Sequence, residues 1–161
     1  KHTLTAEQVR ALIVPASTLS CVGVRSFQAD SEEAGFEAGQ AIDGDPRTFW
    51  HTAFRDSQSG FPHEFVLRFD HPIRLAGFSV LPRQDGNPNG WIKDYAFYVS
   101  MNDRDWGEPV NRGAFAEDGN LKMVTLAAPV TARYIRFVAL SSHNGQPFAA
   151  VAEFDVVEAA P

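Results

Sequence analysis

The chain has 161 residues, 44% of them hydrophobic and 12% aromatic, which suits one folded domain and is too short for two of ordinary size. Its 14 Lys and Arg against 20 Asp and Glu give a net charge of −6, which argues against nucleic acids and anionic membranes as partners. No apolar stretch approaches the roughly 20 residues of a membrane-spanning helix, so no membrane insertion is expected. The single cysteine, Cys21, cannot form an internal disulfide, and we expect it to be buried as a small apolar side chain.

One helix is predicted, over residues 4–14. Thr5 can cap its N-terminus, and Pro15 prevents it from continuing. Since the chain starts with neither Met nor a signal peptide, we expect a segment of a longer polypeptide. In that segment a helical extension, residues 1–15, would precede a core of about 16–157.

At least six strands follow, separated by clusters of Gly, Pro, Asn and Asp. In the clearest one Phe65, Leu67 and Phe69 alternate with more polar residues, as a strand with one buried face requires. The six runs span residues 65–70, 73–81, 95–100, 122–126, 134–140 and 152–157. The scarcity of helices and the absence of a strand–helix alternation predict an all-β fold, an antiparallel sandwich or barrel.

Three long polar loops are expected to carry the function, at residues 28–62, 82–94 and 141–150. The first contains Asp43, Asp45 and Thr48 on a segment that Gly44 and Pro46 bend. Hard oxygen ligands at this density suit Ca²⁺, although the spacing is not that of an EF-hand. From the spacing alone, an Asx-type turn with solvated carboxylates explains these residues at least as well.

Eight short motifs occur in the order found in the family 32 carbohydrate-binding modules of the discoidin-like, coagulation-factor C-domain superfamily, which the chain therefore resembles from about Ala16 to Val157. The motifs are Asp43-Gly-Asp-Pro-Arg-Thr-Phe-Trp-His-Thr52, Pro62-His-Glu-Phe65, Leu81-Pro-Arg-Gln-Asp85, Asn89-Gly-Trp-Ile-Lys-Asp-Tyr95, Tyr98-Val-Ser100, Trp106-Gly-Glu-Pro109, Arg133-Tyr-Ile-Arg136 and Asn144-Gly-Gln-Pro-Phe148.

The resemblance implies a jelly-roll β-sandwich, the galactose-binding-domain-like fold, with one short N-terminal helix, and a single module over residues 1–161. It also implies a structural Ca²⁺. The implied ligands are the side chains of Asp43, Asp45, Thr48 and Glu153 and the backbone carbonyls of Gln40 and Ala152. Since Glu153 lies roughly 100 residues after Thr48, the ion would join the last strand to an early loop, where a clip should stabilise most.

The resemblance further implies a sugar site formed by His51, Arg83, Asn144 and Phe148, with Glu33 and Phe54 contributing in some members. Planar polar groups would bind the sugar hydroxyls, and an aromatic ring would pack on the apolar face of the sugar. Taken singly, each residue also has a structural explanation, such as an ion pair of Arg83 with Asp85. Trp91, where many relatives are polar, could be a second sugar platform or an exposed anchor.

The function expected is non-catalytic binding of terminal galactose-type sugars, such as galactose or N-acetylgalactosamine, to target an attached glycan-active enzyme. The alternative is a discoidin-like module that binds protein or lipid in adhesion, without sugar specificity. Carboxylates one or two positions apart on a loop do not straddle a scissile bond, and no catalytic motif occurs, so we do not expect an enzyme.

The partners implied are a galactose-configured glycan and a covalently linked catalytic domain, with no nucleic acid bound and the module itself a monomer. The resemblance implies a secreted or cell-surface, bacterial protein.

Overall fold

The computed structural model describes residues 18–161, and the helix predicted over residues 4–14 lies outside them. The elements are α2 (Thr18–Val22), β1 (Val24–Ala29), the 3₁₀ helix η1 (Ala38–Ile42), β2 (Trp50–His51), β3 (His63–Leu81), β4 (Asp94–Ser100), β5 (Asn111–Ala114), β6 (Lys122–Ala139), β7 (Ala150–Val151) and β8 (Glu153–Glu158).

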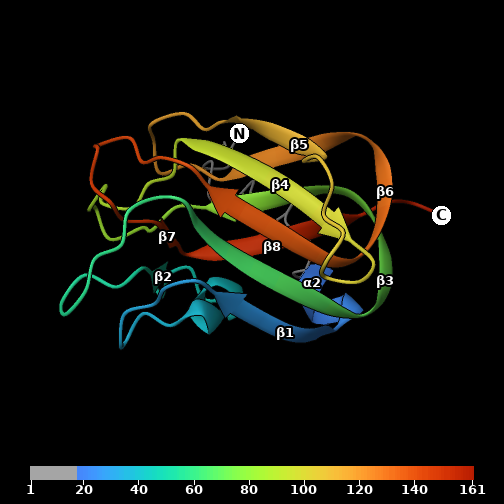
Figure 1. Cartoon of the computed structure of the whole chain (residues 1–161), viewed down its shortest axis with the longest axis horizontal. Coiled ribbons are helices and arrows are strands. Elements are labelled where there is room, and N and C mark those ends of the chain that lie inside the picture. Colours follow the sequence, from blue (N-terminus) through green and yellow to red (C-terminus); the bar gives the residue numbers. More distant parts are fainter. Residues whose placement is uncertain (1–17) are drawn as a thin grey trace, which may run out of the picture.

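Two long strands, β3 and β6, organise an antiparallel sandwich (Figure 1). The strand order in the large sheet is β1-β3-β6-β4-β5, and β8 also pairs with β3. The first half of β3 pairs with β1 and with the second half of β6, whereas its second half pairs with β8 and the first half of β6. Each long strand therefore passes from one layer of the sandwich to the other, and the predicted all-β sandwich is confirmed.

The sequence pattern divides each of these strands into two, at residues 70–73 and 126–134, but the structure keeps each continuous. The interruptions are changes of register, between Arg68 and Ile73 and between Leu75 and Gly77. Such irregularities bend a strand without ending it, which lets one strand belong to both layers. Gly77 lies at the second bend, where a Cβ would collide with the carbonyl oxygen of Val124.

Aromatic side chains fill the space between the layers. Phe65 from the first half of β3 stacks on Phe137 of β6 at 5.3 Å and meets the edge of Phe154 of β8 at 4.8 Å. Phe78, from the second half of β3, stacks on Phe97 of β4 at 4.3 Å. These five side chains are almost completely buried, so they fix the distance between the layers that position the loops.

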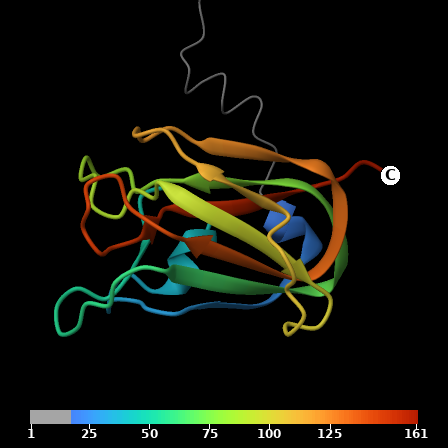
Figure 2. The same ribbon diagram turned by 45° about the horizontal axis from the view of Figure 1, so that its top comes forward.

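Three loops meet at one end of the sandwich, which we call the site end. They are residues 52–62 after β2, 82–93 after β3 and 140–149 after β6. Figures 1 and 2 show them together at the left, with the C-terminus at the opposite end. The small β2–β7 sheet pairs Trp50 with Val151 and His51 with Ala150 at the base of these loops.

Cys21 is exposed in α2, so the expectation that it is buried is wrong. Its helix is a single short turn in which Leu19 alone is buried, and the cysteine lies on the other side. Among residues 18–161, no helix is long and apolar enough to cross a membrane.

Candidate functional site

A cavity of about 210 Å³ lies among the loops of the site end. It combines aromatic rings, amides, one imidazole and one guanidinium, and its lining contains no carboxylate. The lining residues are Phe36, Phe49, His51, Phe54, Gln58, Arg83, Asn87, Asn89 and Phe148. Four of the six predicted sugar residues, His51, Phe54, Arg83 and Phe148, are thus brought together by three separate segments of the chain.

His51 presents a hydrogen-bond acceptor to this cavity. Its Nδ1 lies 2.6 Å from the carbonyl oxygen of Thr52, and a carbonyl can only accept, so Nδ1 carries the hydrogen. Nε2 then bears the lone pair in the neutral ring and makes no hydrogen bond within residues 18–161. Burial lowers the pKa of His51. The hydrogen bond to the Thr52 carbonyl raises it and the charge of Arg83 lowers it, and the net effect is a lowered pKa, so the ring is neutral at pH 7.

Arg83 is a buried cation held from three sides. Asp85 accepts from Nε at 2.9 Å and from Nη2 at 2.6 Å, and the carbonyl of Asn89 accepts from Nη1 at 3.2 Å. The guanidinium carbon also lies 4.4 Å from the ring centre of Phe49. Since a guanidinium has five N–H groups, one on each Nη atom remains for a ligand. The hydrogen bonds from Arg83 hold the pKa of Asp85 below its ordinary value, so the ion pair persists.

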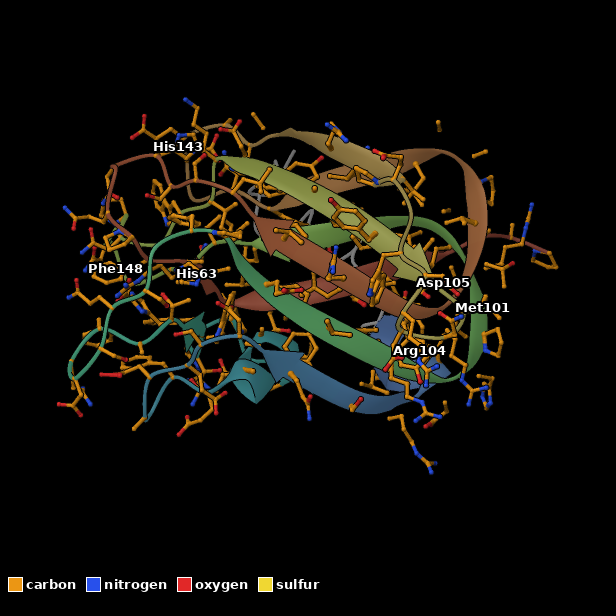
Figure 3. All side chains as sticks on the ribbon, viewed as in Figure 1. His63, Met101, Arg104, Asp105, His143 and Phe148 are labelled. Atoms are coloured by element: carbon orange, nitrogen blue, oxygen red, sulfur yellow. The ribbon has the colours of Figure 1, made fainter. Side chains whose placement is uncertain are left out.

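Two half-buried aromatic rings lie beside His51. Phe54 meets the imidazole edge-on at 4.9 Å, Phe148 lies 5.3 Å from it, and the two phenyl rings are 6.3 Å apart. Figure 3 shows Phe148 among the loops of the site end. The rings thus provide an apolar surface next to the polar atoms of His51 and Arg83.

Asn144 and Glu33, the other two predicted sugar residues, do not line the cavity. Asn144 Nδ2 donates to Asn89 Oδ1 at 2.6 Å, and its own Oδ1 accepts from the backbone N–H of Gln146 at 3.1 Å. Glu33 is buried, and its carboxylate accepts from the backbone N–H of Arg55 at 3.1 Å. Asn144 therefore orients Asn89, and Glu33 holds the segment that follows His51.

Five lining residues were missed from the sequence: Phe36, Phe49, Gln58, Asn87 and Asn89. For Phe49 and Asn89 a signal existed, since each is part of a motif that also contains a predicted or discussed site residue. Phe36, Gln58 and Asn87 line the cavity only because separate loops come together there, and no local sequence pattern predicts that contact.

Trp91 is not part of the cavity lining, but it contacts the backbone of Arg83, which is. Its Nε1 donates to the carbonyl of Arg83 at 3.3 Å, and its ring lies 3.6 Å from where a Cβ on Gly119 would be. The indole thereby ties loop 82–93 to the segment after β5. Its role as a second sugar platform stays a prediction.

The predicted cation loop forms a compact turn beside β8. The carboxyls of Asp43 and Glu153 face each other, and Thr48 donates to Asp43 through its hydroxyl. Burial and the neighbouring Asp43 raise the pKa of Glu153 to about 8. Asp45 is arranged differently, because its carboxylate binds Arg47 at 3.0 and 3.1 Å, while its backbone carbonyl oxygen lies 3.1 Å from the Thr48 hydroxyl oxygen.

These residues fit a bound cation in one respect that a solvated turn does not explain. Glu153 Oε1 is buried and has no hydrogen-bond partner, although it lies beside a second carboxyl group. Within residues 18–161, no three His, Cys, Asp or Glu side chains converge by themselves. A cation here would therefore rely on carbonyl and hydroxyl oxygens as well, which Ca²⁺ accepts.

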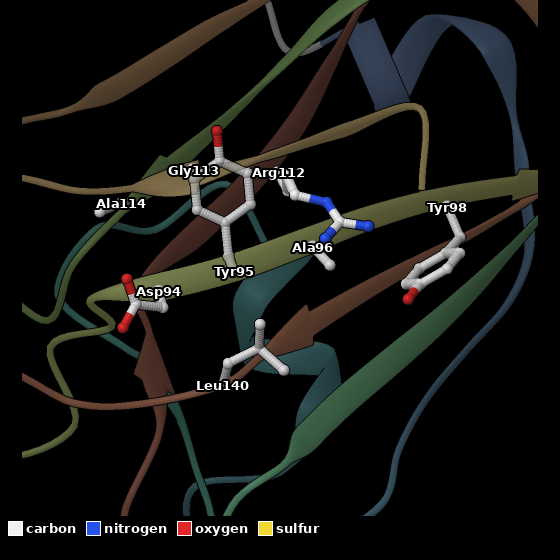
Figure 4. A pocket seen from close by; sticks show the side chains of 8 residues that line it. All are labelled: Asp94, Tyr95, Ala96, Tyr98, Arg112, Gly113, Ala114 and Leu140. Atoms are coloured by element: carbon white, nitrogen blue, oxygen red, sulfur yellow. The ribbon is translucent and has the colours of Figure 1, made fainter. Parts of the chain in front are cut away.

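A larger depression, of about 500 Å³, lies on β4 and β5 (Figure 4). Its two charged side chains already have partners: Asp94 accepts from Ser141 at 2.7 Å, and Arg112 pairs with Glu108 at 3.6 Å. The smaller cavity is the better candidate, since His51 and Arg83 keep hydrogen-bonding groups available for a ligand.

The family model of the F5/8 type C domain matches residues 26–154. A galactose oxidase of Gibberella zeae is 39% identical over 131 residues, covering 81% of this chain and 19% of that protein. A sialidase of Micromonospora viridifaciens is 40% identical over 131 residues, covering 79% and 20%. The chain thus spans about a fifth of the length of these relatives.

Two solved structures are similar over most of their length. The family 32 carbohydrate-binding module of C. perfringens NanJ, in complex with galactose, is 31% identical with a TM-score of 0.71, covering 81% of this chain and 91% of that one. A Clostridium perfringens family 32 module in complex with GalNAc-β-1,3-galactose is 30% identical with a TM-score of 0.73, covering 81% and 93%. The chain belongs to the F5/8 type C domain family and, within it, to the family 32 carbohydrate-binding modules.

Proposed function

We propose that the cavity at the site end binds the terminal sugar of galactose-configured glycans, galactose or N-acetylgalactosamine, without chemical turnover. The observation that carries the proposal is the pairing of a hydrogen-bond acceptor, His51 Nε2, with the two N–H groups that Arg83 keeps available. Relatives of known structure were solved with galactose and with GalNAc-β-1,3-galactose, which supports this ligand class.

The donors and acceptors in the cavity match sugar hydroxyls. A hydroxyl can donate to the lone pair of His51 and accept from Arg83 at the same time. The axial 4-hydroxyl of galactose stands away from the ring plane, so it can meet these groups while the apolar face of the sugar packs on Phe148 and Phe54. Glucose carries this hydroxyl equatorially, and we expect weaker binding.

Binding without catalysis is consistent with the composition of the cavity. Hydrolysis of a glycosidic bond normally needs two carboxyl groups on opposite sides of the bond. Buried Glu33 accepts from the backbone N–H of Arg55, and the more exposed Asp85 pairs with the guanidinium of Arg83, so neither carboxylate is part of the cavity lining. The cavity therefore serves recognition, and any chemistry would belong to a linked domain.

The Asp43–Glu153 turn is proposed to hold a structural Ca²⁺. Asp43, Thr48 and Glu153 would bind it through their side chains, and Gln40 and Ala152 through their backbone carbonyls. Asp45 would contribute its carbonyl oxygen, because Arg47 occupies its carboxylate. When bound, the ion would supply positive charge between two carboxylates and join β8 to the loop before β2.

The larger protein is proposed to be a secreted or cell-surface bacterial one, in which this monomeric module brings a linked glycan-active domain to its substrate. Support comes from relatives such as the sialidase of Micromonospora viridifaciens, in which the matching region is one fifth of the chain. A matching region also occurs in the galactose oxidase of Gibberella zeae.

Binding to a protein or lipid is the second candidate. It would use exposed apolar side chains at the loop tips, with basic residues beside them for an anionic lipid. The exposed large apolar side chains among residues 18–161 are Met101, Val110, Met123, Leu140 and Val157. Of these only Leu140 belongs to the three loops of the site end, which favours the sugar.

Isothermal titration of the chain with galactose, N-acetylgalactosamine, lactose and glucose tests the proposal. We expect binding of the first three sugars, weaker binding of glucose, and loss of binding in His51→Ala and in Arg83→Ala. Arg112→Ala, which removes an exposed guanidinium outside the cavity, is the matched control and should bind normally. Equal affinity for all four sugars, or no effect of either cavity substitution, would contradict the site.

A further inference from the structure

His63 is a completely buried histidine that has no part in the proposed sugar contacts. It is the first residue of β3 and lies at the site end (Figure 3). Nδ1 is 2.9 Å from Asp30 Oδ2, and Nε2 is 2.8 Å from the carbonyl oxygen of Pro147. The ring therefore links the end of β1 to the residue that precedes Phe148.

Both partners of this imidazole are acceptors. A carbonyl oxygen cannot donate, and an ionised carboxylate cannot donate either, so both contacts are hydrogen bonds only when both ring nitrogens carry hydrogen. That state is the imidazolium cation. A neutral ring would have to give up one of the two bonds, and we expect it to keep the stronger bond to the carboxylate.

The carboxylate end of this linkage is fixed to the sheet. Asp30 Oδ1 accepts from the backbone N–H of Glu64 at 2.8 Å, and the Asp30 N–H donates to the Glu64 carbonyl at 2.9 Å. Asp30 cannot follow the ring if the ring moves. A change in the charge of His63 should therefore mainly alter the hydrogen bond to its other partner, the Pro147 carbonyl.

The segment around Phe148 is held on both sides. Ser142 donates to the carbonyl of Gln146 at 2.6 Å, and the Ala149 N–H donates to Thr52 Oγ1 at 3.2 Å. Between these points Pro147 has no N–H to donate, and its carbonyl is bound by His63. The peptide that leads into Phe148 thus depends on this one histidine.

We infer that His63 is a positioning residue of the sugar site, which fixes the Phe148 ring through Pro147 only while both of its ring nitrogens are protonated. The inference rests on the proposed sugar function. It implies that the two buried histidines of the site end need opposite charge states, since His51 must be neutral to accept from the sugar. Sugar affinity should pass through a maximum with pH, with an acid limb from His51 and an alkaline limb from His63.

The groups around both rings agree with this assignment. His63 faces Asp30, the Pro147 and Ser59 backbone, and the edge of the Phe61 ring at 4.9 Å. Burial alone would lower the pKa of His63, but the hydrogen bonds to Asp30 and Pro147 outweigh it and leave the pKa raised. His51 faces the charged groups Arg83, Glu33 and Asp85 and the Thr52 carbonyl, and its pKa is lowered.

The charge of His63 can be tested without any sugar. Nitrogen NMR of the imidazole rings, from about pH 5 to about pH 9, should show His63 with both nitrogens protonated at about pH 6 and losing one proton with a midpoint above the ordinary histidine value of about 6.5. The ring signals of Phe148 should shift with the same midpoint. A neutral His63 at pH 6, or Phe148 signals that ignore its titration, would overturn the inference.

Asp30→Asn is the discriminating variant. The new amide can donate to Nδ1 of a neutral His63 and still accept from the Glu64 N–H, so Nε2–H keeps its bond to Pro147 at any pH. Titration with methyl β-galactoside should show an alkaline loss of about fivefold in the natural chain, the effect of one lost hydrogen bond. Asp30→Asn should lack this loss while it binds normally near neutral pH.

Two further variants complete the test. His63→Gln should bind about fivefold more weakly throughout and show no alkaline limb. His71→Gln, which replaces an exposed histidine of β3, is the control and should reproduce the natural profile. A purely structural role for His63 predicts the same alkaline behaviour in the natural chain and in Asp30→Asn, which would refute the inference. Absence of sugar binding at every pH would instead refute the proposed function, and the NMR result would still decide the charge of His63.

Discussion

The guanidinium of Arg83 is held by an ion pair, a backbone carbonyl and an aromatic face, all supplied by residues 49–89. Because these contacts fix both its position and its plane, a ligand need not spend free energy on ordering a long side chain. The same contacts make the site depend on residues that a ligand never touches, such as Asp85.

Replacing Asp85 by Asn should weaken galactose binding about tenfold, since Arg83 loses its charged two-point partner and the orientation of its remaining N–H groups. Calorimetric titration measures the change. Glu108→Gln removes the exposed partner of Arg112 and is the matched control, with unchanged binding expected. An affinity for galactose that survives Asp85→Asn would show that Arg83 does not need this orientation.

His51 should make the free energy of unfolding sensitive to acid. Its pKa is lowered in the folded state, so below about pH 6.5 the unfolded chain binds the proton more readily than the folded chain. Stability that is present above this pH is therefore lost as the pH falls. Urea unfolding at about pH 7 and about pH 5 should show a larger loss for the natural chain than for His51→Gln, and an equal loss would contradict the assignment.

The sequence could indicate individual site residues where a motif surrounds them, as it does for His51, Arg83 and Phe148. It could not show that the Asn144 amide would donate to Asn89 and not to a ligand, because that hydrogen bond joins two loops 55 positions apart. The same holds for His63, whose partners Asp30 and Pro147 come from different loops. Contacts of this kind depend on the register of the whole sandwich.

Among the elements, β3 combines two functions. Its first half carries His63 and the core residues Phe65 and Leu67, and its second half leads to Leu81, two residues before Arg83. The alternation of buried and exposed residues was predictable for each half. The continuity of the strand was not, because a bend within a strand and a turn between two strands both interrupt the alternation.

Gly77→Ala tests the importance of the bend in β3. A Cβ at this position meets the backbone of Val124 and Thr125 in β6, which cannot move without breaking the pairing. We expect a loss of about 1–3 kcal/mol in the free energy of unfolding, measured by urea denaturation. Gly60→Ala, in loop 52–62 with no atom near the new methyl group, is the control and should change little.

At the scale of the whole molecule, the early loop and the last strand meet at the Asp43–Glu153 turn. If Ca²⁺ binds there, it closes a loop of roughly 100 residues, and its removal should cost the folded state stability. If the free Ca²⁺ concentration is about 1,000 times the dissociation constant of the site, chelation should lower the melting temperature by on the order of 10 °C.

The matched variants sharpen this measurement. Glu153→Gln removes the repulsion with Asp43, so it should be more stable than the natural chain in chelator and respond less to added Ca²⁺. Glu117→Gln, an exposed carboxylate after β5, should respond like the natural chain. A melting temperature that is the same with Ca²⁺ and with chelator would contradict the cation site.

The size of the cavity at the site end has a consequence for how the module would be used. A volume of about 210 Å³ is below the roughly 300–1,000 Å³ of pockets that enclose larger ligands, so it suits one sugar ring. A single ring offers few atoms for binding, and its residence time is correspondingly short. Retention on a glycan surface would then come from avidity, in which a tethered partner domain engages neighbouring chain ends and keeps the module close enough to rebind. Such an arrangement would let the protein move from one glycan terminus to the next.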